Sequence, residues 1–207
     1  MVDAGEAIVE RQGIEALTMR RLAEDLQSSP MALYRHVRDK DELLVLLLDR
    51  RASELPRPAL PDDPRARLLI LFRLLYDGLS ESAWIVEVLV KGDLIAPSIL
   101  WVLDDILAAF RAAGLSPERA AAAYHVAWRY TVGELTVRHE SARHLAALDR
   151  APIVRGIVAE LGPEELPTLV ALGRELAVAR EGLRYDEGLA AVIDGLLGWR
   201  VAPPHCD

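Results

Sequence analysis

Four side chains that can contact nucleic acid share one face of a short helix expected after Pro30. They stand at positions i, i+3, i+4 and i+7: Met31, Tyr34, Arg35 and Arg38. Leu33 and Val37 fall on the opposite face, where they can pack against the rest of the protein. A guanidinium pairs with two acceptors of a guanine, and a short helix packed along one edge fits the major groove of DNA. The pattern therefore predicts a DNA-contacting face with Arg35 as its base-reading residue.

A preceding helix and a tight turn would hold this face in place. Thr18 can cap the free N–H groups at the start of a helix over residues 19–26. Leu22, Ala23 and Leu26 give that helix an apolar stripe for packing. The dipeptide at 27–28 interrupts the pattern, and Ser29 followed by Pro30 is a second start signal. The segment is predicted to form two short helices joined by a turn.

The same segment resembles the DNA-binding signature of the TetR family of one-component transcriptional regulators. The resemblance is carried by LTMRRLAEDL, which begins at Leu17, and by PMALYRHVRDKDELL, which begins at Pro30. It implies DNA contacts from nine residues: Thr18, Arg20, Pro30, Met31, Tyr34, Arg35, His36, Arg38 and Lys40. One departure is Gln27, where the family usually has glycine. Either the turn bends differently, or a non-glycine residue adopts positive φ at a cost of about 1 kcal/mol.

The charge of this segment is modest. The chain carries a net charge of −8, which argues against a nonspecific coat for nucleic acids. Residues 18–40 hold five basic and three acidic side chains, a net of +2. Because attraction to phosphates scales with the local number of cations, one such segment would bind DNA weakly. We expect affinity to depend on two of these heads acting together.

The composition fits a protein with a sizeable core and no secretion signal. Of 207 residues, 52% are hydrophobic, enough for one large or two small domains. No apolar run approaches the roughly 18 residues that span a membrane, and the N-terminus lacks a secretory apolar core. Cys206 has no second cysteine to pair with and fits a reducing compartment. These features predict a cytoplasmic protein without membrane association.

Helical periodicity extends along the whole chain and predicts an all-α fold. The sequence LPRPALPDDP places four prolines in ten residues, a boundary that no helix crosses. It divides the chain into a helix-turn-helix head with its connecting helix, residues 1–54, and a ligand-binding and dimerisation domain, residues 55–207. Besides the two short helices, we expect helices over residues 3–12, from Asp39 or Asp41 to 54, and over 63–80, 83–91, 99–110, 117–143, 163–180 and 186–198.

Aromatic and polar side chains are concentrated in the middle helices. Six of them are candidates for one ligand pocket: Phe72, Tyr76, Trp101, Tyr124, His125 and Trp128. The last three share a helical face with Leu135. Aromatic rings with a few polar groups are typical of a cavity for a small apolar molecule. Ordinary core packing with polar tips at the surface is the alternative for any one of them.

The last helix carries an apolar stripe with little chain left to cover it. Its members are Leu189, Val192, Ile193, Leu196 and Leu197. Packed against its copy, with residues 117–143 alongside, the stripe would build a four-helix interface between subunits. The resemblance implies the same, since TetR members dimerise through their C-terminal helices. The alternative is that the stripe fills the core of its own subunit.

Signatures of catalysis are absent. The sequence has no Gly-rich phosphate loop, no His-Glu-x-x-His motif and no pair of cysteines. His139 and His144 are five residues apart and turn away from each other, while Glu134 and Glu140 fit a solvated helix surface. We expect no enzyme activity, cofactor or metal. The resemblance instead implies a homodimeric repressor, released from a palindromic double-stranded operator by a small, largely apolar effector. A helical ligand-binding protein or enzyme with a vestigial head, and an activator, remain alternatives.

Overall fold

The computed structural model describes residues 1–91, 94–145 and 164–199, and over these residues it contains helices and no strands. The all-α prediction is confirmed. The first half of the chain folds into α1 (Val2–Gln12), η1 (Ile14–Ala16), α2 (Met19–Asp25), α3 (Pro30–Leu33), α4 (Lys40–Ser53), α5 (Pro64–Ser80) and α6 (Ala83–Lys91). The second half folds into η2 (Pro97–Ile99), α7 (Leu100–Ala112), α8 (Pro117–Leu145), α10 (Pro167–Gly182) and α11 (Tyr185–Leu197).

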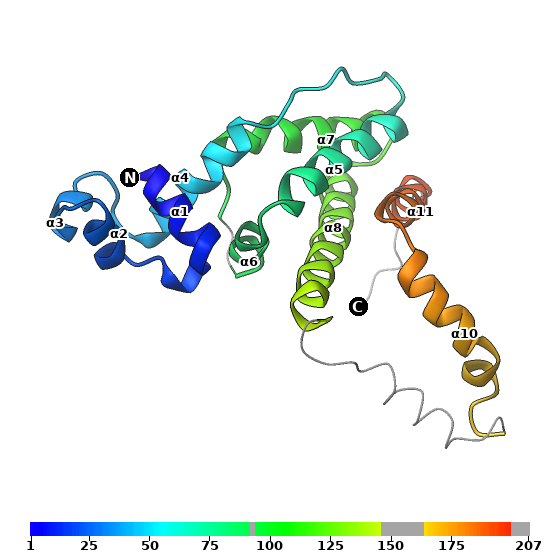
Figure 1. Ribbon diagram of the computed structural model, residues 1–207. Coiled ribbons are helices and arrows are strands. Elements are labelled where there is room, and N and C mark those ends of the chain that lie inside the picture. Colours follow the sequence, from blue (N-terminus) through cyan, green and yellow to red (C-terminus); the bar gives the residue numbers. More distant parts are fainter. Residues whose placement is uncertain (92–93, 146–163, 200–207) are drawn as a thin grey trace, which may run out of the picture.

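A small head and a larger body are joined by α4 (Figure 1). The head consists of α1, α2 and α3, and its core is closed by the inner face of α4. The largest fully buried side chains of this core are Ile8, Leu17, Leu22, Leu43 and Leu47. Three residues of α6 pack into the same core: Trp84, Ile85 and Val88. The head therefore rests on the body through both α4 and α6.

Local capping signals explain where the helices of the head begin. The side chain of Thr18 accepts a hydrogen bond from the amide of Arg21 (3.1 Å), and that of Ser29 accepts one from Ala32 (3.2 Å). Asp39 rather than Asp41 opens the connecting helix, because its carboxylate accepts a bond from the amide of Glu42 (2.8 Å). The predicted starts at Thr18 and Ser29 are confirmed.

The second of the two short helices ends earlier than the sequence predicts. α3 stops at Leu33, residues 34–36 form a turn, and Arg38 lies beyond it. The cause is competition from the next helix: Glu42 accepts a hydrogen bond from the Arg38 amide (2.6 Å) while its own amide bonds Asp39. Arg38 is therefore held in the cap of α4, and the expected continuous helical face over residues 31–38 is wrong.

The turn between α2 and α3 contains the one non-glycine residue with positive φ in the described part of the chain. This residue is Gln27, with φ of 50°. The turn thus keeps a left-handed geometry although glycine is missing. The side chain of Gln27 is exposed, so nothing packs against it to offset the backbone strain.

We expect Gln27→Gly to raise the free energy of unfolding by about 0.5–1 kcal/mol, because relief of strain outweighs the extra freedom of the unfolded chain. Gln12→Gly is the matched control. Gln12 lies in the last turn of α1 and has the same side chain. Glycine there should lower the free energy of unfolding by about the same amount. Urea denaturation checks both values, and a Gln27→Gly variant no more stable than the parent would show an unstrained turn.

In the body, α5, α7, α8 and α11 enclose a second core. Its largest fully buried residues include Phe72, Phe110, Ile106, Leu135 and Leu189. The predicted helix starts near 63 and 117 and the stop at Gly114, which has φ of 93°, are confirmed. α10 begins at Pro167, and residues 164–166 precede it as turn and bend. The expected start at Pro163 is therefore wrong, and Pro163 itself lies outside the described residues.

The apolar stripe of the last helix faces inward. Leu189, Ile193 and Leu196 are 1%, 0% and 5% exposed in the body core, and Val192 and Leu197 are partly buried against the same core. An ion pair between Arg73 of α5 and Asp186 (2.8 Å) helps to hold α11 in this orientation. Leu189, Ile193 and Leu196 therefore belong to the core of their own subunit, and their assignment to the dimer interface is wrong. A role of the partly buried Val192 and Leu197 in that interface stays a prediction.

Candidate DNA-binding head and ligand cavity

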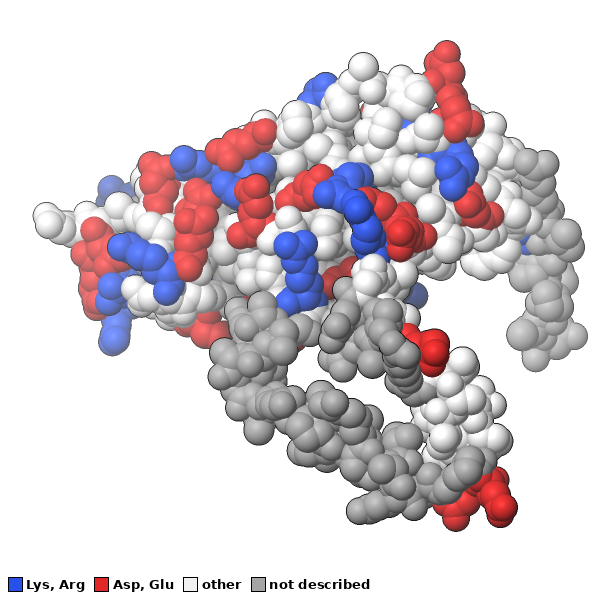
Figure 2. Space-filling view, turned by 45° about the vertical axis from the view of Figure 1, so that its right-hand side comes forward, with Lys and Arg blue, Asp and Glu red and all other residues white. Residues whose placement is uncertain are grey.

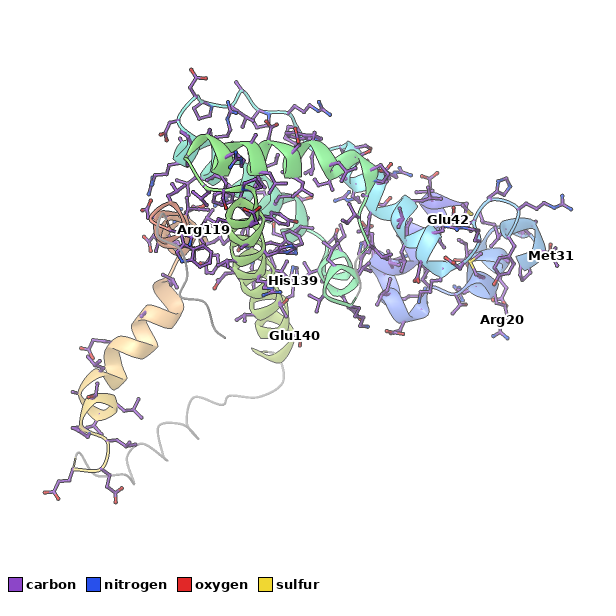
Figure 3. All side chains as sticks on the ribbon, turned by 180° about the vertical axis from the view of Figure 1, so that it is seen from behind. Arg20, Met31, Glu42, Arg119, His139 and Glu140 are labelled. Carbon is purple, nitrogen blue, oxygen red and sulfur yellow. The ribbon has the colours of Figure 1, made fainter. Side chains whose placement is uncertain are left out.

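The predicted DNA-contacting residues lie on the outer side of the head. Met31 and Tyr34 are 72% and 49% exposed, and Pro30, Arg35, His36 and Arg38 are exposed as well. Figure 3 shows Met31 and Arg20 at the end of the head that points away from the body. Exposed apolar groups rimmed by polar residues are a feature of surfaces that bind a partner. Contact with DNA by these residues stays a prediction.

Most basic side chains of residues 18–40 already have acidic partners. Ion pairs join Arg20 to Glu24 (3.6 Å), Arg21 to Asp25 (3.2 Å) and Arg38 to Glu42 (3.2 Å). The ammonium group of Lys40 donates a hydrogen bond to the carbonyl oxygen of Ile14 (3.1 Å), which ties α4 to η1.

Arg35 is the exception. Within the described residues it is exposed and has no carboxylate at ion-pairing distance. On the face of the molecule seen in Figure 2, basic and acidic side chains are interspersed, without a broad positive field. The geometry therefore leaves one guanidinium of the turn after α3 free to read a base.

A cavity of about 1050 Å³ lies between the connecting helix and the body. Its walls come from α4, α5, α6, η2, α7 and α8. Aliphatic side chains dominate the lining, among them Leu48, Leu55, Leu89, Ile99, Leu103 and Ile106. Drug-sized ligands occupy pockets of about 300–1,000 Å³ with mostly apolar walls and few polar groups. The cavity has the size and the chemistry of a site for a large apolar molecule.

Polar groups of the cavity are concentrated on α8. They are Tyr124, His125, Trp128, Arg129 and Thr136, to which α4 adds Arg51. The rings of Tyr124 and Trp128 are stacked with centroids 6.4 Å apart and an interplanar angle of 14°. Burial raises the pKa of the Tyr124 phenol, so its hydroxyl remains a neutral hydrogen-bonding group. One helix thus offers flat rings and hydrogen-bonding tips, and the other walls offer apolar area.

The structure separates the six residues predicted to share one pocket. Tyr124, His125 and Trp128 line the cavity, whereas Phe72, Tyr76 and Trp101 do not. Phe72 is fully buried in the body core. The ring of Tyr76 stacks on Tyr185 of α11 at 3.9 Å, and its hydroxyl accepts a hydrogen bond from Arg138 (3.0 Å).

Trp101 has a different neighbour, the guanidinium of Arg57 in the segment before α5, 4.8 Å from its ring centroid. Phe72 is thus buried in the core, and Tyr76 and Trp101 are each engaged by residues distant in sequence. Their inclusion in the ligand pocket is therefore wrong.

Sequence reasoning missed the contribution of α4. Leu48, Ala52 and Leu55 stand at i, i+4 and i+7 and line the cavity. The signal was present, since α4 carries more apolar residues than the head's core needs and so has a second apolar face. Close packing supports this face: a Cβ atom on Gly78 of α5 would lie 2.6 Å from Leu55.

Polar contacts join α4 to both parts of the molecule beside the cavity. Arg51 forms ion pairs with Glu6 of α1 (3.7 Å), Glu54 (3.4 Å) and Glu81 after α5 (3.5 Å). Two residues before Arg51, the carboxylate of Asp49 accepts a hydrogen bond from the amide of Ser98 in η2 (2.6 Å). A displacement of α4 would disturb these contacts. The same helix therefore forms a wall of the cavity and supports the head.

The described residues contain neither a cluster of metal ligands nor a membrane-spanning helix. In the described part of the chain, no three His, Cys, Asp or Glu side chains gather as metal ligands do. Cys206 and the side chain of His144 lie outside the described residues. Among the helices that the structure describes, none is long and apolar enough to cross a bilayer.

Two family models cover most of the chain. "Bacterial regulatory proteins, tetR family" matches residues 1–47, and "Tetracyclin repressor-like, C-terminal domain" matches residues 57–199. The chain belongs to the TetR family. As a member, it is a ligand-responsive, DNA-binding transcriptional repressor.

Known TetR proteins resemble it over most of its length. The HTH-type transcriptional repressor DrrR1 of Streptomyces coeruleorubidus is 27% identical, with 95% of this chain and 75% of DrrR1 covered. An HTH-type transcriptional regulator of Saccharopolyspora erythraea is 32% identical over 66% of this chain, which spans 58% of that relative.

Solved structures of ActR from Streptomyces coelicolor share the fold. Apo ActR superposes with a TM-score of 0.78 at 26% identity and covers 95% of this chain and 92% of its own. ActR in complex with actinorhodin gives a TM-score of 0.77 at 26% identity, and the match covers 95% of this chain and 94% of ActR.

Proposed function

We propose that this TetR protein binds a near-palindromic operator as a homodimer and leaves it when a flat, largely apolar molecule fills the cavity. Residues 1–54 would act as the DNA-binding unit, and residues 55–207 as the ligand-binding and dimerisation unit. The observation that carries the proposal is the position of the cavity, because one of its walls is the helix that holds the head. An effector in this place contacts the body and the support of the head together.

A population shift would connect ligand binding to release. The effector would contact Leu48 and Ala52 of α4 and Leu55 just after it on one side, and the rings of α8 on the other. The bound effector would favour the arrangement of α4 that gives the effector its best contacts. The shift of α4 would change the spacing of the two heads. Operator half-sites lie about one turn of DNA, roughly 34 Å, apart, so a changed spacing weakens binding. Only an effector that prefers the DNA-incompetent arrangement produces release.

The dimer would use the outer face of α8 and α11, which the protomer leaves uncovered. On α8 this face carries Ala122 and Val126, which are both exposed and do not line the cavity, Val126 by 40%. The two helices pack against each other (Figure 1), and small exposed residues of α11 continue the face, Ala191 and Gly195. Small and apolar side chains let two helix pairs approach closely as a four-helix bundle.

ActR supports a ligand site in this fold, since it was solved in complex with actinorhodin and is 26% identical to this chain. The match covers 95% of this chain. The identity of this chain's own effector rests on its own lining. Stacked rings on one wall and aliphatic side chains on the others suit a flat apolar molecule better than a sugar or a phosphate.

We expect Trp128→Ala to raise the Kd of N-phenyl-1-naphthylamine, a neutral apolar fluorophore, by about 5- to 30-fold, because a large stacked ring is lost from the cavity wall. Operator binding without a ligand should not change. Trp101→Ala is the control, since Trp101 does not line the cavity. Fluorescence titration measures both, with circular dichroism to verify folding. Equal effects of the two substitutions would show that the cavity is not the binding site.

A further inference from the structure

We propose that the cavity selects molecules with a single anionic group at one edge of a large apolar body, and that Arg129 binds this group with His125 beside it. The inference rests on the proposed ligand-binding function and specifies the chemical class of the ligand. A carboxylate, sulfonate or phenolate on a polycyclic framework would satisfy it.

The charges of the cavity lining are all of one sign. They come from Arg51 and Arg129, and no aspartate or glutamate contributes to the lining. A guanidinium at the edge of an apolar cavity can pair bidentately with a carboxylate or another anion that a ligand carries. The lining therefore favours a ligand that brings a negative charge.

The two arginines differ in their partners. Arg51 is surrounded by three carboxylates, those of Glu6, Glu54 and Glu81, at 3.4–3.7 Å. Its charge is already compensated by the protein. Arg129, within the described residues, has no carboxylate at ion-pairing distance. An incoming anion would find its counter-ion on α8 and not on α4.

The position of Arg129 determines which end of the ligand is charged. Arg129 and His125 are one turn apart on α8, and both line the cavity while being exposed, so they stand where it opens to solvent. A guanidinium there can bind a carboxylate bidentately while water still reaches the anion, which keeps the desolvation cost low. Tyr124 and Trp128 continue inward as stacked rings, and the remaining walls are aliphatic. The apolar body of the ligand would extend from α8 toward α4.

Two fluorophores that differ by one sulfonate test this inference. 1-Anilinonaphthalene-8-sulfonate carries the anion, and N-phenyl-1-naphthylamine has the same rings without it. We expect Arg129→Gln to raise the Kd of the sulfonate about tenfold, as expected for loss of one charge-assisted contact. The Kd of the neutral probe should change less than twofold, and Arg129→Lys should restore part of the affinity for the sulfonate. Arg119→Gln is the matched control, because Arg119 lies on α8 but does not line the cavity.

Two results would overturn the assignment of the anion to Arg129. One is an unchanged Kd of the sulfonate in Arg129→Gln, and the other is an equal loss of affinity for both probes, which would indicate altered packing. A failure of the proposed function itself looks different. The parent protein would bind neither probe, or Trp128→Ala would leave both Kd values unchanged, and either result would also overturn the inference.

Discussion

Replacing Ala122 and Val126 together by arginine is expected to dissociate the protein into monomers and to lower operator affinity by a factor on the order of 10²–10⁴. Both positions are on the exposed face of α8, and neither lines the cavity. Arginines there would place unpaired charges in the proposed interface. Operator affinity falls because each head has a small net positive charge and depends on a second head held at the matching distance.

Light scattering at micromolar concentration and gel shift with an operator duplex measure the two effects. The duplex can be selected by the protein itself from a random-sequence library. Leu100→Arg serves as control, since Leu100 is 48% exposed on α7, away from the α8–α11 face. A parent protein that is monomeric at this concentration would refute the dimer. So would a double variant that remains dimeric with undiminished operator affinity.

Arg35→Ala should weaken operator binding by about 1–3 kcal/mol, roughly 5- to 150-fold, and relax the preference at one base pair of each half-site. The reason lies in the ion pairs of the head. Arg20, Arg21 and Arg38 have acidic partners on their own helix or cap, while Arg35 has none among the described residues. Arg35 can therefore meet a guanine without first giving up a carboxylate.

A set of duplexes with single base changes separates base reading from general attraction to phosphate. Arg35→Ala should lose discrimination at one position, whereas Arg20→Ala should weaken all duplexes alike and by less. Lys40→Ala is a poor control, because Lys40 also supports the head through the carbonyl of Ile14. If Arg35→Ala left both affinity and base preference intact, the segment after α3 would not be the reader.

Local signals predicted most of the fold. In the caps at Thr18, Ser29 and Asp39, each side chain binds an amide three residues further on. Such short-range signals are visible in the sequence, although for the connecting helix it left Asp39 and Asp41 both open. The end of α3 was missed because the cap of the next helix competes for Arg38. The outcome depends on whether a longer α3 or the cap of α4 is more stable. The spacing of apolar residues does not reveal this difference in free energy.

The sequence shows which face of a helix is apolar, but it does not show which part of the protein packs against that face. The stripe of α11 shows that one side of this helix avoids water, but the same pattern fits a partner subunit and the helix's own core. The rotation of α5 and α7 likewise depends on Tyr185 and Arg57, distant in sequence, which engage Tyr76 and Trp101 away from the cavity.

The central claim is that the cavity and the operator compete through α4. Quenching of tryptophan fluorescence first identifies the flat aromatic acid that binds most tightly. The most direct measurement then compares the Kd of the selected duplex without this ligand and with a saturating concentration of it. We expect the ligand to weaken duplex binding and the duplex to weaken ligand binding by the same factor. Trp128→Ala should remove both effects at that concentration. The contrary result would be a set of ligands whose tight binding depends on Trp128 and Arg129 but none of which changes the Kd of the duplex. This result would contradict competition through α4.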